Sequence, residues 1–536
     1  MREKLFNFIG LALLALCFAA SLVRTLSRHA STSEDGQPQR ITIRFAHWQL
    51  EDGPREAFAR IAAEYSRLHP EVRIEQLPIP ERVFSSWLVT QLVGGTAPDI
   101  IELGKGLEIG QLVRYFVPLS DLAEAPNPYN HGTPLEGLPL RETFFDGMEG
   151  GYNPLLLEYY GVPISGGSIR LFYNLELLER ITGSRRLPRT SGELMALCEK
   201  IARHAAKEGV PLVPIAGSRY NAPFLMEALF SSQTQKLAET LNPPGIIDGN
   251  PVAQASGYLE GRWNLRSDAV RSGLTLMREV GRAMQPGFSQ IMRDDATLLF
   301  VQNRAVMICT GSWDATSIRR QITFPLGVSP IPFPSPNDPV YGPHTLGARS
   351  EAGVNAGISF GLTRYSSHPE VAADFLLFLA SRQANQLWTD VSGWIPSILT
   401  TRPGPEVEPF LPVLEGWLPG LMPSISKGFA DTSRLFNTSF HLLVSPFGSV
   451  EAMIDTLEDD YPEAIRRDLE RERLKRIQIL QRGDTQLAAL AWLARDPAAP
   501  PADRARLDLL LQADSTNQRN FYRTRFALEK AGTPSP

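Results

Sequence analysis

A repeating alternation of strand and helix patterns, which begins near residue 41, constrains the fold more than any other feature of the sequence. Residues 41–45 alternate apolar and polar side chains, as a half-buried strand does. An amphipathic helical segment then stops at His69-Pro70, a second strand covers 72–77, and a second helical segment stops at Gly94-Gly95. A third short strand lies at 100–101. This order is typical of a parallel sheet with right-handed crossovers, so we predict an α/β fold.

The same pattern returns later in the chain. Residues 357–363 are predicted as a strand, and the capping box Ser367–Glu370 then starts a helix. Between the two regions, helices are predicted near 192–206 and 266–284, and a strand at 306–309. The α/β pattern therefore extends to about residue 400.

The sequence changes character beyond that point. Residues 401–423 are rich in proline and predict an irregular segment. Residues 450–481 are charged and helical in pattern, and short amphipathic helices are predicted at 487–494 and 504–512. We expect a helical C-terminal extension over 462–536. It either packs on the preceding part of the chain or forms a separate arm that binds a partner.

An uncharged apolar run, Leu5–Val23, follows two basic residues at the N-terminus. It is longer than the core of a usual signal peptide and close to the length that spans a bilayer. Residues 1–23 are therefore predicted to be a signal peptide or a membrane anchor, and the polar residues 24–40 a tether. Cleavage, lipidation at Cys17 and retention all stay open. Each places the rest of the chain in the periplasm or on the extracytoplasmic face of the cytoplasmic membrane.

Composition excludes several classes of protein. The chain has only 3 Cys, so no disulfide framework is expected. Its net charge is -5 and it lacks a long basic tract, which argues against nucleic acid as a partner. The sequence contains no G-x-S-x-G, Walker A or H-E-x-x-H motif, and its 8 His are scattered. We predict a monomer that is not an enzyme, with no catalytic residue, no metal and no cofactor.

Four segments of the sequence resemble motifs of one protein family. The first, residues 41–75, contains a strand, an aromatic loop and a helix that ends in a His-Pro step. The second is LVGGTAPDIIEL at 92–103; the third is LFVQNRAVMICTGSWDA at 299–315, where Asn303 replaces the family's usual glycine. The fourth, residues 357–397, ends in SGWIPS. In this order they resemble the extracellular solute-binding proteins of family 1, the sugar-binding subunits of ABC importers, which include maltose-binding protein.

The resemblance implies a two-lobed periplasmic-binding-protein fold, similar to type II, with discontinuous lobes. Mapped onto this chain, lobe one holds residues 41–163 and 342–381. Lobe two holds residues 164–341 and 382–461. The helical extension, residues 462–536, follows lobe two. In the family, ligand lies between the lobes, which close on it.

The resemblance also implies which residues contact ligand. A sugar ring has weakly apolar C–H faces and a polar rim, so its site needs flat aromatic side chains and hydrogen-bonding groups. Trp48 follows the first predicted strand, Trp313 matches a position where the family commonly stacks a sugar, and Trp394 lies in the returning loop. The predicted ligand-binding residues are Trp48, Glu51, Glu102, Lys105, Ser165, Ser168, Trp313 and Trp394.

Each of these residues also has an ordinary structural interpretation. The tryptophans could fill the core, and Glu51 could cap the helix that follows it. Glu102 and Lys105 could pair with each other. Residues 165–168 contain two glycines that permit unusual backbone angles, and they could form only a loop where the chain crosses between the lobes.

Taken together, the resemblance implies an extracytoplasmic protein that captures a carbohydrate and delivers it to the permease of an ABC importer. An alternative is a two-lobed sensory module that reports a ligand to a signalling partner, with the C-terminal extension as its signalling region. A minor alternative is a glycan-acting hydrolase, which needs two carboxylates about 5–9.5 Å apart in one cleft. The identity and length of the sugar stay open, as does the permease.

Overall fold

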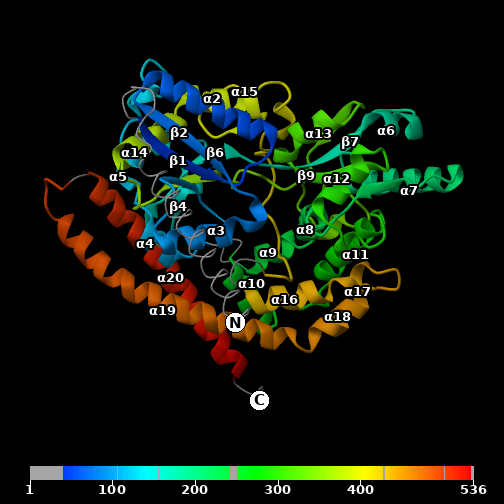
Figure 1. Ribbon diagram of the computed structural model, residues 1–536. Coiled ribbons are helices and arrows are strands. Elements are labelled where there is room, and N and C mark those ends of the chain that lie inside the picture. Colours follow the sequence, from blue (N-terminus) through cyan, green and yellow to red (C-terminus); the bar gives the residue numbers. More distant parts are fainter. Residues whose placement is uncertain are drawn as a thin grey trace, which may run out of the picture.

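The computed structural model describes residues 40–104, 107–154, 156–241, 250–425, 429–499 and 501–532. The predicted signal or anchor segment, and all of the predicted tether except Arg40, lie outside these ranges. Within them the chain forms two lobes, each with its own sheet, and a long helical hairpin (Figure 1). No helix of these ranges is both long enough and apolar enough to cross a membrane.

The first lobe contains a six-stranded mixed sheet. Its strand order is β12 (Ile395–Pro396), β6 (Val162–Gly166), β11 (Gly357–Leu362), β3 (Ile100–Glu102), β1 (Ile41–His47) and β2 (Val72–Pro78). β1 pairs in parallel with β2 and β3, which confirms the α/β pattern predicted from the sequence. β11, to which the chain returns from the second lobe, is antiparallel to β3 and β6.

Aromatic side chains form the centre of the first lobe. Phe45 of β1 lies 5.0 Å from Phe58, 4.5 Å from Phe360 and 5.8 Å from Phe375, measured between ring centroids. These partners come from the helices on one face of the sheet and from β11, so burial of one aromatic cluster joins both halves of the lobe. The helices of the lobe are α2 (Asp52–Leu68), α3 (Glu81–Gly94), α4 (Ile109–Tyr115), α5 (Ser120–Glu124), α14 (Pro369–Leu379) and α15 (Arg382–Ser392), and a short ribbon joins β4 (Tyr152–Asn153) to β5 (Glu158–Tyr159).

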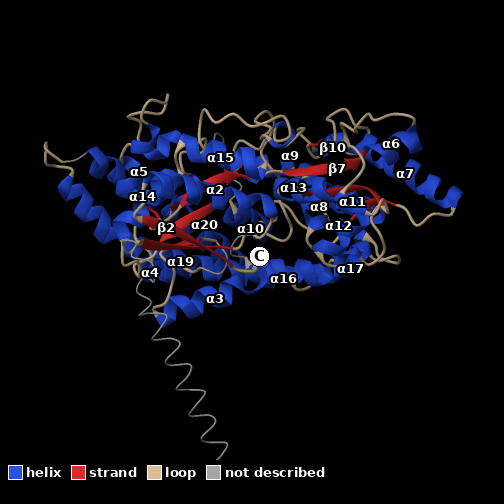
Figure 2. Ribbon diagram, turned by 45° about the horizontal axis from the view of Figure 1, so that its top comes forward, coloured by secondary structure: helices blue, strands red, loops and turns tan. Residues whose placement is uncertain are grey.

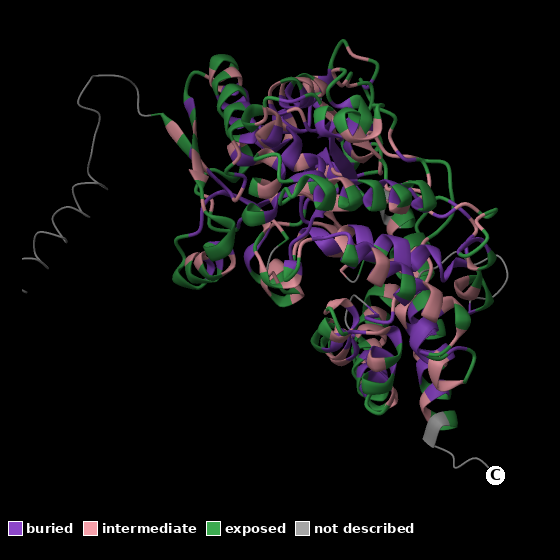
Figure 3. Ribbon diagram, turned by 90° about the vertical axis from the view of Figure 1, so that its right-hand side faces the viewer, coloured by how far each residue is buried: buried purple, intermediate pink, exposed green. Residues whose placement is uncertain are grey.

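The second lobe contains a four-stranded sheet in the order β10 (Leu326–Ser329), β7 (Ile169–Asn174), β9 (Ala305–Gly311) and β8 (Val213–Ala216). Figure 2 shows the strands of the two sheets as separate groups, covered by helices. The helices of the second lobe are α6 (Leu175–Thr182), α7 (Ser191–Glu208), α8 (Asn221–Ser232), α9 (Gln235–Leu241), α10 (Pro251–Leu259), α11 (Asp268–Arg282), α12 (Arg293–Val301) and α13 (Ala315–Gln321). Buried residues lie on the inward faces of these elements (Figure 3).

The chain crosses between the lobes three times, and Arg170 holds the three crossing segments together. Its side chain is completely buried in β7, just after the first crossing. The guanidinium donates to both oxygens of Glu351 in the second crossing, at 2.7 and 3.0 Å. It also donates to the carbonyl oxygens of Pro409 and Leu411 in the third crossing, at 2.9 and 2.7 Å. A buried cation with a bidentate partner therefore holds the three crossing segments side by side between the lobes.

The structure differs from the predicted lobe boundary after residue 381. Residues 382–398 were predicted in lobe two, but α15 packs along α2, and Ile395 of β12 pairs with Gly166 in the first sheet. Trp388 of α15 is 1% exposed, and its ring centroid lies 4.8 Å from that of Phe58. The apolar face of α15 is therefore buried by the first lobe.

A second difference concerns residues 342–349, which were predicted in lobe one. They pack on α9 of the second lobe, where the side-chain oxygen of Gln235 accepts hydrogen bonds from the Thr345 hydroxyl and the Leu346 backbone, at 3.0 and 2.8 Å. One buried glutamine, far away in the sequence, thus accepts the hydrogen bonds that the backbone and hydroxyl groups of this bend need. The chain enters the first lobe only after this bend.

The C-terminal extension forms a hairpin of two long helices, α19 (Tyr461–Leu493) and α20 (Pro501–Gly532). α19 joins part of the helix predicted over 450–481 to the short helix predicted at 487–494, and α20 is longer than the helix predicted at 504–512. It follows α16 (Ala430–Ser439), α17 (His441–Val444) and α18 (Val450–Glu458). Ile465 and Leu469 of α19 are buried in the core of the second lobe, whereas Trp492 near the hairpin tip is 72% exposed. The inner half of the hairpin is thus part of the second lobe. At its outer half, Arg506 reaches Asp121 of the first lobe at 3.3 Å.

Candidate ligand-binding cleft

A cavity of about 1500 Å³ lies between the two lobes and in front of the crossing segments. Both lobes line it. Of the residues predicted to bind ligand, those that line this one cavity are Trp48, Glu51, Glu102, Ser165, Ser168, Trp313 and Trp394. Lys105 lies outside the described residues. The sequence positions are far apart, so the fold itself brings these side chains together.

Two tryptophans face the cavity from opposite lobes. Trp48 leaves the C-terminal end of β1 and lies edge-on to Phe84 of α3, with ring centroids 4.8 Å apart. Trp313 follows β9 and lies over two glycines: a Cβ at Gly167 would come within 3.5 Å of its ring, and one at Gly311 within 2.2 Å. A side chain at residue 311 would displace the indole, so Gly311 fixes where Trp313 sits. Both indoles are half-buried, which leaves part of each ring open to the cavity.

Trp394 belongs more to the core than to the cavity. It is 4% exposed and meets Trp388 at 5.7 Å between ring centroids, with the ring planes perpendicular. Its indole N–H has no hydrogen-bond partner among the described residues. Most of the Trp394 side chain is therefore buried in the core of the first lobe, and little of it is available to a ligand.

Glu102, at the end of β3, is completely buried at the inner wall of the cavity. Its carboxyl oxygens accept hydrogen bonds from the Gln49 side chain at 2.6 Å and from the Trp48 backbone at 3.1 Å. Burial nevertheless raises the pKa of Glu102 to about 8, because the charged form loses its hydration. At neutral pH the group is mainly protonated, and can donate a hydrogen bond.

Glu51 precedes α2 and lines the same wall. Its side chain makes no capping hydrogen bond to the helix, although capping was one interpretation of this residue. One of its carboxylate oxygens is buried and has no partner among the described residues. An unpaired buried acceptor beside a cavity suits a ligand hydroxyl group, because pairing it removes a desolvation cost.

The protonated state of Glu102 leads to a testable pH dependence. Between about pH 4.5 and pH 8 the folded state holds a proton on Glu102 that the unfolded state releases, so the contribution of Glu102 to the free energy of unfolding falls as pH rises through this window. The contribution of Glu102 to this change is on the order of 5 kcal/mol. Burial lowers the pKa of His47 to about 4, which acts in the opposite direction up to about pH 6.5, so the effect of Glu102 is read from the difference between variant and native protein. Glu102→Gln keeps the neutral hydrogen-bonding pattern and should remove most of this fall, as measured by urea unfolding at pH 5 and pH 9.

The matched control is Glu370→Gln, on the exposed surface of the same lobe. It should leave the pH dependence of the native protein unchanged. If Glu102→Gln and Glu370→Gln gave the same pH dependence, Glu102 would be ionised in the folded state at neutral pH.

The hydroxyls of Ser165 and Ser168 serve the crossing segments. Ser165 donates to the Ile395 carbonyl at 2.8 Å, and Ser168 donates to the Phe410 carbonyl at 2.7 Å. Both residues lie at the first crossing: Ser165 joins it to β12 within the first sheet, and Ser168 joins it to the third crossing. Their polar atoms are therefore engaged by the protein itself.

One face of α8 contributes residues that sequence reasoning missed. Tyr220, Phe224, Glu227 and Ser231 all line the cavity, and they recur every three or four residues. Phe224 lies edge-on to Trp313, at 6.2 Å between ring centroids. The guanidinium of Arg293 lies 5.1 Å from the centre of the Tyr220 ring and pairs with Asp314. The helical spacing was the available signal, but an apolar stripe in a helix usually faces a core.

Comparison with known proteins places the chain in a protein family. Residues 61–409 match the sequence model of the bacterial extracellular solute-binding proteins. An uncharacterised ABC transporter extracellular-binding protein of Pyrococcus horikoshii is 19% identical over 448 residues, which cover 80% of this chain and 89% of that protein. The multiple sugar-binding protein of Streptococcus mutans is 20% identical over 376 residues, 68% of this chain and 76% of that protein.

Solved structures agree with this assignment at the level of the fold. A chitin oligosaccharide binding protein superposes with a TM-score of 0.54 at 15% identity, and the match covers 80% of this chain and 100% of that one. The solute-binding protein RafE in complex with raffinose gives a TM-score of 0.52 at 17% identity, covering 79% of this chain and 100% of that one. At these identities the likeness establishes the two-lobed fold.

Proposed function

Because the chain belongs to the bacterial extracellular solute-binding protein family, we propose that it captures a carbohydrate in the cleft and delivers it to the permease of an ABC importer. The observation that carries this proposal is that Trp48 and Trp313, which come from different lobes, line the same cavity as the carboxyl groups of Glu51 and Glu102. The sugar-binding proteins among its relatives and structural neighbours support the same ligand class.

In the proposed complex each aromatic ring covers one apolar face of a sugar. Glu51 accepts hydrogen bonds from sugar hydroxyls. Glu102, which is completely buried, accepts from the Trp48 backbone and the Gln49 side chain and so fixes this wall of the cleft. Because the two tryptophans sit on different lobes, a sugar between them gains both contacts only when the lobes approach each other. Ligand therefore stabilises a closed state relative to an open one.

Location and partners follow from the same proposal. A solute-binding protein of this family works outside the cytoplasm, and we place this one in the periplasm or at the extracytoplasmic face of the membrane. Residues 1–23 act there as a cleaved signal or a retained anchor. The delivery partner is the membrane-embedded permease, and the binding protein acts as a monomer.

A two-lobed sensing module is the second candidate, favoured by the exposed outer half of the α19–α20 hairpin. Uptake of the bound sugar by cells with and without the gene separates the two functions. If the protein delivers sugar, cells without the gene should not take the sugar up. If it is a sensor, cells without the gene should still take up supplied sugar once the importer has been induced.

The proposed ligand class can be tested by thermal shift against monosaccharides and oligosaccharides. A ligand that binds only the folded state at a hundredfold excess over Kd adds about 2.7 kcal/mol to stability. We expect at least one carbohydrate to raise the melting temperature. No shift with any carbohydrate, together with a shift for another class of solute, would overturn the proposal.

Ligand should also compact the protein. Small-angle scattering with and without the sugar identified by the screen should give a smaller radius of gyration in its presence, since the lobes close on the ligand. An identical radius in both samples would mean that the cleft is rigid and that ligand does not bridge the lobes.

A further inference from the structure

The cleft extends well beyond the two tryptophans, and its extent can be estimated from the length of α8, which lines it. The cavity-lining residues along α8 run from Tyr220, which immediately precedes the helix, to Ser231 at its other end. At 1.5 Å per residue, the axial distance between them is about 16 Å. The cavity volume of about 1500 Å³ is likewise above the roughly 300–1,000 Å³ of ordinary small-molecule sites. The cleft therefore has room for more than the group held between the tryptophans.

Apolar side chains of the second lobe line part of this cavity, beside polar ones such as Arg189, Glu227 and Gln254. Four of the apolar side chains, which we call the apolar wall, are half-buried: one side packs on the core of the lobe and the other faces the cavity. They are Leu187, Ile331, Phe333 and Met422. Pro188, Pro332 and Pro419 line the cavity beside them. Side chains of this kind offer a sugar rim no hydrogen bonds, but they suit a hydrocarbon or aryl group.

The segment that carries Met422 is fixed at the far end of α8. The Gly420 backbone donates to the Ser231 carbonyl at 3.1 Å, and the Gln254 side chain donates to the Met422 carbonyl. Thr234 donates to the Leu421 carbonyl at 2.9 Å. These bonds hold the segment in place, although it has no regular secondary structure. It also lies beyond residue 409, where the match to the family ends.

We propose that the apolar wall forms a second subsite, which takes a hydrocarbon or aryl substituent attached to the carbohydrate. The protein is then a receptor for an amphiphilic glycoside: the sugar lies between Trp48 and Trp313, and the apolar substituent lies along Leu187, Ile331, Phe333 and Met422. This inference rests on the proposed carbohydrate function and adds the chemical class of the ligand. A small molecule is the fitting occupant because the wall is continuous with the sugar site inside one cavity.

Matched pairs of methyl and octyl glycosides test the second subsite. The probes are the methyl and octyl β-glycosides of glucose, galactose and maltose, used below their micelle concentrations with the purified full-length protein in calorimetry. Each buried methylene group strengthens binding by about fourfold. We expect the octyl member of at least one pair to bind more than tenfold tighter than its methyl partner.

Two variants locate the effect. Met422→Gln and Ile331→Asn should each bring the octyl-to-methyl affinity ratio toward one, and should leave the affinity for the methyl glycoside unchanged. Leu474→Asn, which replaces a leucine that is 49% exposed on the hairpin, is the control and should not change the ratio. Circular dichroism and melting temperatures establish that each variant is folded.

The outcomes separate this inference from the proposed function. Sugars that bind, with an octyl-to-methyl ratio near one in every pair, would overturn the second subsite and leave carbohydrate capture intact. A high ratio that survives both folded wall variants would place the octyl chain elsewhere and also overturn it. If neither sugars nor glycosides bind, both proposals are wrong. If a variant fails to fold, the octyl-to-methyl affinity ratio of the native protein still tests whether a second subsite exists.

Discussion

Replacing Trp313 with alanine should weaken ligand binding at least thirtyfold and lower stability only moderately. Loss of a stacking aromatic side chain from a desolvated site typically costs about 2 kcal/mol or more, which corresponds to about thirtyfold in Kd. Trp313 is half-buried, with one side over Gly167 and Gly311 and an edge toward Phe224. Calorimetry with the sugar found by the thermal-shift screen gives Kd, and a thermal melt gives stability.

Trp417→Ala is the matched control for this experiment. Trp417 is also in the second lobe and is 48% exposed, but it does not line the cavity. It should leave Kd within about twofold, as expected for an exposed side chain outside the cavity lining. An unchanged Kd for Trp313→Ala, together with a large fall in melting temperature, would make Trp313 a core residue and remove the main support for the proposed function.

Local patterns in the sequence predicted the elements of the fold well where one face of each element is buried. The strand predicted at 72–77 corresponds to β2, Val72–Pro78, and the helix that ends before His69 corresponds to α2. The parallel pairing of β1 with β2 and β3 also agrees with the predicted βαβ order. These features depend on side-chain periodicity within one segment, which the sequence displays directly.

The sequence could not show which lobe covers an amphipathic segment. The sequence pattern of α15 indicates that one face of the helix is buried. It does not indicate that this face packs on α2 and not on a helix of lobe two. The same holds for residues 342–349, whose bend depends on Gln235. Long-range partners of this kind are fixed by tertiary packing, so the lobe boundaries at 342 and 381 could be predicted only approximately.

The residues of the cleft were predictable where a side chain follows directly from a strand end. Trp48, Glu102 and Trp313 each end a strand or follow one, and the carboxyl ends of strands in an α/β sheet face the ligand crevice. Tyr220 and Phe224 lie on a helix whose apolar face could equally fill a core, so their place in the cleft required the structure.

Asn303 illustrates a departure from the family pattern that the backbone explains. It lies between α12 and β9 with φ 60°, in the left-handed region that glycine adopts freely and asparagine tolerates. Its side-chain oxygen also accepts a hydrogen bond from Asn174 at 2.7 Å. Asparagine can therefore replace the usual glycine without loss of the turn that leads into β9 and on to Trp313.

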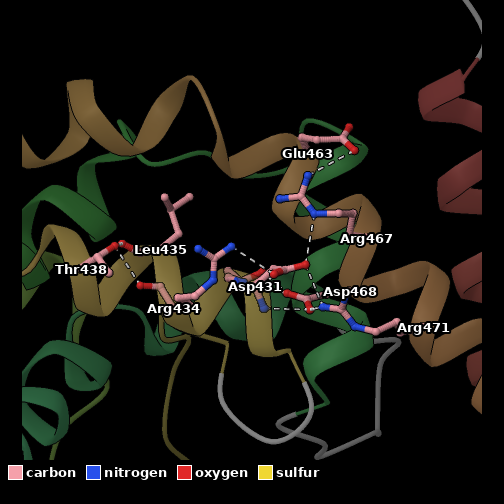
Figure 4. A network of polar contacts seen from close by, with 9 residues as sticks. Asp431, Arg434, Leu435, Thr438, Glu463, Arg467, Asp468 and Arg471 are labelled. Carbon is pink, nitrogen blue, oxygen red and sulfur yellow. Dashed lines mark hydrogen bonds and ion pairs between the residues drawn. The ribbon is translucent and has the colours of Figure 1, made fainter.

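Replacing Asp468 with alanine should destabilise the second lobe by about 3 kcal/mol, although the residue belongs to the C-terminal extension. Asp468 is completely buried in α19 and faces the start of α16 (Figure 4). Its carboxylate accepts hydrogen bonds from the backbone N–H groups of Asp431 and Thr432, at 3.1 and 2.8 Å, and from the Thr432 hydroxyl at 2.5 Å. Arg471 pairs with the same carboxylate.

The physical reason is that one side chain satisfies several buried donors at once. The first backbone N–H groups of α16 have no acceptor within their own helix, and the Asp468 carboxylate of α19 supplies one. Alanine would leave these donors without an acceptor and would remove one of the two carboxylates that Arg471 binds. Arg471 also binds Asp431 at 3.0 Å and, as the largest influence, helps to lower the pKa of Asp431 to about 2. Asp431 is therefore ionised at pH 7, where the variant should be compared.

Urea unfolding at pH 7 should show a transition midpoint lower by roughly 1 M for Asp468→Ala. Asp484→Ala, an exposed residue on the outer half of α19, is the control and should shift stability by at most about 0.5 kcal/mol. Equal and small shifts for both variants would mean that α19 is dispensable for the second lobe. The whole hairpin would then be an independent arm, and its partner should be sought at the permease or at a signalling protein.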